Sequence, residues 1–109
     1  METEEIALTI DRLQGAFEDL AVRGLRSAGP RDLATLRVVR EEFERIGAGH
    51  LAGRIAEVIR AIEAHDRSAA RALLQAQASL RVFERILTLE VAAAALQAMA
   101  DGEQEGEAP

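Results

Sequence analysis

The two histidines, His50 and His65, are the side chains of this 109-residue chain best suited to metal binding. A di-iron or di-manganese helical bundle needs Glu-x-x-His pairs that project inward from two of its helices. Position 47 is Gly and position 62 is Ile, so neither histidine follows a Glu at the required spacing. Both histidines are therefore expected to be structural, and His65 falls at a predicted helix C-terminus, which favours positive charge.

The glycine-rich run from Gly47 to Gly53 has the composition of a phosphate-binding loop. A phosphate loop follows a β-strand and carries a Lys, whereas this run follows a predicted helix and the chain contains no Lys. The run is therefore expected to be a turn followed by the start of a helix.

The densest basic region combines two arginines from the second predicted helix with two from the fourth, namely Arg37, Arg40, Arg81 and Arg85. Glu41, Glu44 and Glu84 lie close to them in sequence, so ion pairs are expected there rather than an active site. The chain shows no Ser-His-acid motif, and the absence of Cys excludes cysteine nucleophiles and cysteine zinc sites. The sequence therefore predicts no catalytic residue, no metal and no cofactor.

The charge balance disfavours nucleic acid and anionic membranes as partners. The formal net charge is −6 at pH 7, and both of those partners attract basic surfaces. The second and third predicted helices also make a poor helix-turn-helix, because the third carries as many glutamates as arginines on its polar face. Acidic and basic blocks alternate along the chain, which suits neighbouring antiparallel helices.

The sequence predicts a cytoplasmic protein with no membrane partner. The stretch from Met1 to Glu5 is acidic, unlike a secretory signal or a transit peptide. The longest stretch of low charge runs from Ile86 to Ala100, and it is interrupted by Glu90 and too short to span a bilayer.

Apolar residues recur at helical spacing along almost the whole chain, and 49% apolar content suffices for one core. Breaks at Gly24 to Pro30, at Gly47 and near Asp66 divide the pattern into four helices, over about residues 3–23, 30–46, 48–64 and 67–100. The breaks are short, so we expect an all-α fold, an antiparallel up-down four-helix bundle with a long C-terminal helix. Residues 1–100 form one predicted helical domain, and residues 101–109 form a predicted disordered acidic tail.

Aromatic residues are few, and the three that occur, Phe17, Phe43 and Phe83, each lie on the apolar stripe of their helix. We expect them to meet in one core cluster.

The fourth predicted helix is longer and more apolar than a small bundle needs. At 1.5 Å per residue it would be about 50 Å long, while the second and third would be about 25 Å or less. Its first apolar stripe suits the bundle core, and its second consists of Val82, Ile86, Leu89, Ala93 and Leu96. The other helices are too short to cover the second stripe, which predicts an interface. The alternative is a bend near Thr88 that folds the chain back as a fifth short helix.

One pattern resembles a known family. Its residues are Gly24-Leu25, Asp32-Leu33, Leu36, Ile46-Gly47, His50-Leu51-Ala52, Ile55, Ala70 and Leu73-Leu74. This stretch resembles a helical accessory region in some bacterial proteins with SWIM-type zinc fingers, although the zinc finger itself needs cysteines and is absent. The resemblance implies a non-enzymatic accessory module of a bacterial multiprotein system, and it assigns no functional residue.

The function we expect is a non-enzymatic helical module for protein–protein interaction or oligomerisation, either an adaptor or an assembly subunit. Its partner would be a second copy, with a dimer as the first guess, or another helical protein. The alternative is a small helical-bundle enzyme or ligand-binding protein with an unrecognised site. A preformed apolar pocket with converging arginines would favour that alternative, and an exposed Leu/Ala seam would favour association.

Overall fold

A computed structural model describes residues 3–107 of the chain. It contains α1 (Thr3–Arg23), a 3₁₀ turn η1 (Leu25–Ser27), α2 (Pro30–Ile46), α3 (Gly49–Glu63) and α4 (Ala69–Glu107). The described residues include no β-strand, and the first three α-helices have nearly their predicted bounds. The predicted all-α class is confirmed.

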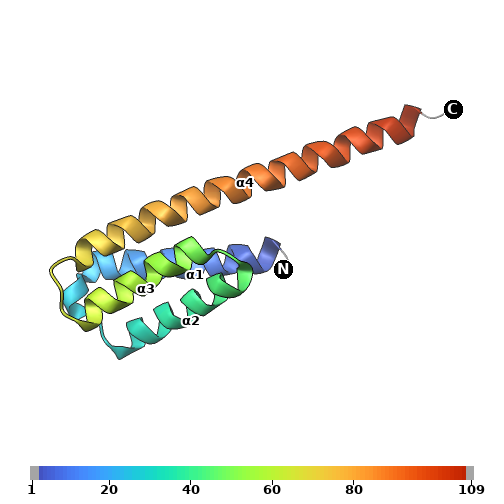
Figure 1. Cartoon of the computed structure of the whole chain (residues 1–109). Helices are drawn as coiled ribbons and strands as arrows, with labels where there is room; N and C mark the ends of the chain where they lie inside the picture. Colours follow the sequence, from blue (N-terminus) through green and yellow to red (C-terminus); the bar gives the residue numbers. More distant parts are fainter. Residues whose placement is uncertain (1–2, 108–109) are drawn as a thin grey trace.

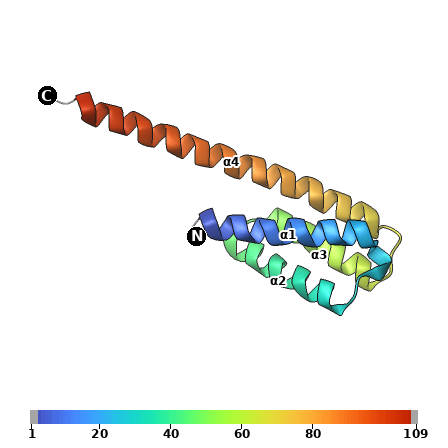
Figure 2. The same ribbon diagram turned by 180° about the vertical axis from the view of Figure 1, so that it is seen from behind.

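Successive helices run in opposite directions, so the predicted antiparallel up-down arrangement is confirmed (Figure 1). The first half of α4 packs along α3 and more lightly along α1, while its second half projects beyond the other helices (Figures 1 and 2). The projection makes the molecule elongated, with extents of 68 × 22 × 20 Å. The molecule is therefore about one third as wide as it is long.

The first turn of α2 is held by Asp32, which joins it to the end of α1. Pro30 opens the helix, and Asp32 Oδ2 accepts the backbone N–H of Gly29 at 2.8 Å. Asp32 Oδ1 accepts a hydrogen bond from Arg23 Nη2 at 2.6 Å. The Gly29 N–H, with further help from Arg23, lowers the pKa of Asp32 below its usual value. Hydrogen bonds to Asp19 and then Asp32 raise the pKa of Arg23, so the guanidinium stays charged.

Left-handed backbone conformations end α2 and α3. Gly47 follows α2 with φ 92°, and His65 follows α3 with φ 52°. After His65, the N–H of Asp66 donates to the carbonyl oxygen of Ala61 at 2.9 Å, which closes the last turn. Glycine adopts this conformation without a Cβ clash, whereas a histidine there is strained by about 1–2 kcal/mol. His65 thus lies at a helix end, as its position in the sequence predicts.

Asp66, at the third break in the sequence pattern, caps the N-terminus of the last helix. Asp66 Oδ1 accepts the N–H of Ser68 at 2.9 Å, and this bond lowers the pKa of the Asp66 carboxyl. The regular helix begins after this turn, at Ala69.

The core takes buried apolar side chains from all four helices, with Leu13, Leu20, Leu36, Val39, Ile55 and Val58 among the fully buried ones. Phe17 and Phe43 are buried at its centre. Phe83 is half-buried and meets Phe43 edge to face, with ring centroids 5.7 Å apart and planes at 89°. The predicted phenylalanine cluster therefore forms, with Phe83 at its edge.

A buried hydroxyl ties α1 to α2. Thr9 Oγ1 lies 2.8 Å from Glu42 Oε2 and 3.0 Å from the backbone oxygen of Glu5, and shares its proton between them. The other oxygen of Glu42 accepts a hydrogen bond from Arg12 Nη1 at 2.9 Å. The pairing satisfies the hydroxyl of Thr9, the one buried polar residue in the described part of the chain.

The last helix runs without interruption from Ala69 to Glu107, so the alternative of a fold-back near Thr88 is wrong. The Thr88 hydroxyl donates to the carbonyl oxygen of Glu84 at 2.8 Å, a bond that a helix accommodates. The helix also continues past Asp101, where the sequence places the start of a tail. The helical residues between and after the two glycines there are Glu and Gln, which are good helix formers. Composition alone therefore does not mark the end of the helix.

Candidate functional site

The bundle covers only part of α4. Leu73, Ala76 and Leu80 are buried against the core, and Phe83 and Leu87 are half-buried. Every residue from Thr88 to Gly102 is exposed. The burial of the first stripe thus ends at Leu87, where the other helices end.

The five residues of the predicted interface lie together on one side of α4, outside the stripe that packs on the core. Val82 is two residues from buried Leu80, which at 3.6 residues per turn places it about 200° around the helix axis. The exposed fractions are 56% for Val82, 50% for Ile86, 64% for Leu89 and 67% for Leu96, and Ala93 is also exposed. We call this set, Val82, Ile86, Leu89, Ala93 and Leu96, the outer face.

Small residues continue the bundle-facing side of α4 beyond the bundle. Val91, Ala94 and Ala98 repeat the helical position of Leu87 and are exposed. Glu90 is the one charged residue between Ile86 and Ala100. Without a packing partner, a segment with so few charges leaves a large apolar surface exposed to water.

A groove runs beside the outer face, between the start of α3 and the middle of α4. Its volume is about 300 Å³, and it is lined by His50, Arg54, Gln75, Ala78, Ser79 and Val82. Arg54 Nη1 donates to Gln75 Oε1 at 3.3 Å across the groove. We call it the α3–α4 groove. Val82 belongs to both the groove and the outer face, and the Arg54 guanidinium lies at the edge of the groove.

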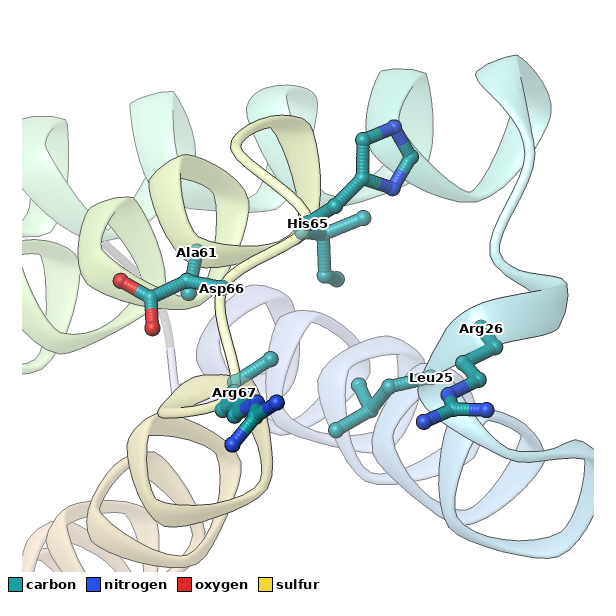
Figure 3. A pocket seen from close by; sticks show the side chains of 8 residues that line it. Leu25, Arg26, Ala61, His65, Asp66 and Arg67 are labelled. Atoms are coloured by element: carbon teal, nitrogen blue, oxygen red, sulfur yellow. The ribbon is translucent and has the colours of Figure 1, made fainter.

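A second recess lies at the opposite end of the bundle, where η1 meets the turn between α3 and α4 (Figure 3). It measures about 370 Å³, and Arg26 and Arg67 point toward each other across it on either side of Leu25 (Figure 3). The Asp66 carboxylate points away from these guanidinium groups, and Arg26 and Arg67 are exposed. Exposed arginines over an open recess hold an anion weakly, because water competes for every contact.

The structure changes the partners predicted for the basic region. Arg37 pairs at 3.1 Å with Glu63 of α3, which is outside the expected set, while Arg40 lies 4.0 Å from Glu44, one of the expected glutamates. Glu84 forms no ion pair with an arginine in the described part of the chain.

Glu84 Oε1 instead accepts a hydrogen bond from Gln14 Nε2 of α1 at 2.6 Å. Sequence spacing identified neighbours along one helix, whereas two of these three partners come from another helix. The Gln14–Glu84 bond, the Thr9–Glu42 bond and the place of Arg54 at the groove were missed for the same reason.

The described residues also bear on metal binding and on membrane insertion. Among them, no three His, Cys, Asp or Glu side chains gather as a metal site would require. None of the helices described here is long and apolar enough to cross a membrane.

No family model, no curated protein and no solved structure matches this chain. The resemblance to the accessory region of SWIM zinc-finger proteins therefore stays a prediction.

Proposed function

We propose that this protein is a non-enzymatic association module, an adaptor or assembly subunit, whose second half of α4 binds another helix. The single observation that carries the proposal is the exposure of the outer face along a continuous helix. Burying a Leu, Ile or Val side chain stabilises by about 1.5–3 kcal/mol, so covering several of them at once favours association.

The arrangement also suits a helical partner in shape. The outer face has apolar residues at steps of 4, 3, 4 and 3, which is the seam that packs helix on helix. The run Ala92 to Ala95 adds small side chains at which a second backbone can approach closely. We propose self-association, with a dimer as the simplest assembly, and a different helical protein as the alternative partner.

A cytoplasmic location belongs to the same proposal. It is supported by the absence of Cys, because disulfide bonds are typical of proteins in oxidising compartments and this chain can form none. Fractionation of cells that express the tagged chain would test it.

A ligand-binding function ranks second, because one specific feature favours it. Arg26 and Arg67 converge on the recess at the η1 end and offer two cations to an anionic ligand (Figure 3). Their exposure argues for weak binding, whereas the outer face presents several large apolar groups.

Light scattering coupled to size exclusion tests the association. The wild-type chain should elute as a dimer, and Leu89→Arg should elute as a monomer. An unpaired charge buried at the seam costs about 3–5 kcal/mol, which weakens the dimer more than about a hundredfold.

Val22→Arg is the matched control, because Val22 is an exposed apolar residue that lies on α1 and is not part of the outer face. The control should leave the dimer intact, and circular dichroism should show similar helicity in all three proteins. A wild-type chain that stays monomeric at high micromolar concentration would exclude self-association.

A further inference from the structure

We propose that the outer face is covered by a second copy of this chain, with its α4 antiparallel to the first and a two-fold axis at Leu89. This inference rests on the proposed function, because it specifies the geometry of the same association. In this geometry the α3–α4 groove of each copy receives the acidic end of the other copy's α4. Arg54 then pairs with the partner's Asp101.

The spacing of the outer face is nearly symmetric about Leu89. Val82 precedes it by seven residues and Leu96 follows it by seven, while Ile86 precedes it by three and Ala93 follows it by four. An antiparallel copy therefore sets Val82 against the partner's Leu96 and Ile86 against the partner's Ala93. The large Ile86 side chain thus meets a small one, and Leu89 meets its own copy on the axis.

The charges of α4 favour the same direction. Residues 67–85 carry four Arg and one Glu, and residues 86–109 carry five acidic residues and no Arg. Two parallel copies would lay basic half on basic half and acidic half on acidic half. Two antiparallel copies oppose the halves, so each basic half faces an acidic one.

The edges of the helix identify which side chains meet. Glu90, Gln97 and Asp101 lie on the same edge of α4 as Ser79, because separations of 11, 7 and 4 residues are close to whole turns. Ser79 lines the α3–α4 groove, so this is the edge beside α3. A two-fold axis perpendicular to a pair of antiparallel helices brings each edge against the same edge of the other copy.

The groove then becomes the place where that edge docks. Residue 101 of the partner lies opposite residue 77, within one turn of Gln75. Gln75 holds the Arg54 guanidinium at 3.3 Å, at the edge of the groove. Among the described groups of the single chain, the Asp101 carboxylate accepts one hydrogen bond, from Gln97 Nε2 at 3.0 Å. The antiparallel pair gives this carboxylate a cation.

Single-cysteine variants test the direction, because the chain has no Cys of its own. Leu89→Cys should form a disulfide-linked dimer when oxidised with copper phenanthroline. Val82→Cys and Leu96→Cys should each remain largely unlinked alone, and a mixture of the two should link to each other. Helicity measured by circular dichroism confirms that each variant is folded.

The outcomes separate this inference from the proposed function. Val82→Cys and Leu96→Cys that each link to their own kind would show a parallel pair, which keeps self-association and overturns the antiparallel geometry. A wild-type chain that is monomeric by light scattering, with no linking in any variant, would overturn both.

Charge reversal tests the Arg54 contact. Arg54→Glu should weaken the dimer on the order of tenfold by sedimentation, and the added change Asp101→Arg should restore it. Arg31→Glu, which changes an exposed arginine in the first turn of α2 at the end of the bundle opposite the groove, alters the net charge equally and should have no such effect. An unchanged dissociation constant for Arg54→Glu, or no recovery in the double variant, would overturn the assignment of Arg54.

Discussion

At the level of single residues, Asp32 links the start of α2 to the end of α1. It accepts the N–H of Gly29 and a hydrogen bond from Arg23, and these bonds stabilise its charged form. The pKa of Asp32 is therefore lower in the folded chain than in the unfolded chain. Such a carboxyl stabilises the fold fully above its unfolded pKa, and that stability is lost as the pH falls through its folded pKa.

Asp32→Asn should therefore lower the melting temperature at pH 7, and the difference from wild type should begin to shrink below about pH 4 and vanish once the pH is below the folded pKa of Asp32. Melting curves followed by circular dichroism from neutral pH downward measure this difference. Asp11→Asn, on the exposed surface of α1, is the control. A difference that stayed constant from pH 7 to the acid limit would mean that the charge of Asp32 does not stabilise α2.

His65 is a second residue whose backbone decides where a helix ends. Its φ of 52° belongs to the region that glycine occupies without strain. His65→Gly should therefore raise the stability by about 1 kcal/mol, measured by urea denaturation. Ala64→Gly changes the neighbouring helical position, where φ is −83°, and should instead destabilise the protein. Lower stability of His65→Gly would show that the imidazole makes a stabilising contact.

At the level of elements, the apolar stripes of α2 and α4 each contribute a phenylalanine to the core, and the two are buried to different extents. Phe43 is fully buried, whereas Phe83 is half-buried and packs against the Phe43 ring in an edge-to-face arrangement. Phe43→Ala should cost about 3–5 kcal/mol of unfolding free energy, and Phe83→Ala should cost less, about 1–3 kcal/mol. Chemical denaturation of both variants measures the two costs. Equal costs would mean that Phe83 is covered by something more than its own chain, such as a second copy.

Helix bounds and apolar stripes could be predicted because they depend on neighbours along the chain. Pro30, Gly47 and Asp66 act locally, through a fixed φ, a left-handed conformation and an N-cap. The end of α4 could not be predicted in the same way, because Glu and Gln favour helix and the glycines weaken it only moderately.

The candidate site was predictable in position and only partly in composition. The length of α4 relative to the other helices follows from sequence and places the outer face beyond the bundle. The α3–α4 groove depends on which edge of α4 faces α3, and hence on long-range packing. Arg54 is therefore recognised as a groove residue only in the folded chain.

At the level of the whole molecule, the first half of α4 packs in the bundle and its second half extends far past the bundle (Figures 1 and 2). We call the part of α4 after Leu87 the rod. The bundle is stabilised by its own core and by contacts between helices, such as Gln14 to Glu84. The rod beyond Leu87 makes no such contacts in its described residues. The two parts of the molecule therefore depend on different sources of stability.

A lone helix end of this length is marginal in water, because its backbone hydrogen bonds open readily without tertiary contacts. Amide hydrogens after Leu87 should exchange with deuterium quickly in dilute solution and slowly once the outer face is covered, while those in α1 to α3 stay protected throughout. The rod would then become ordered only when two copies associate. The apparent thermal stability of the protein would therefore rise with the protein concentration. In a cell, the amount of this chain would set how much of it is fully folded.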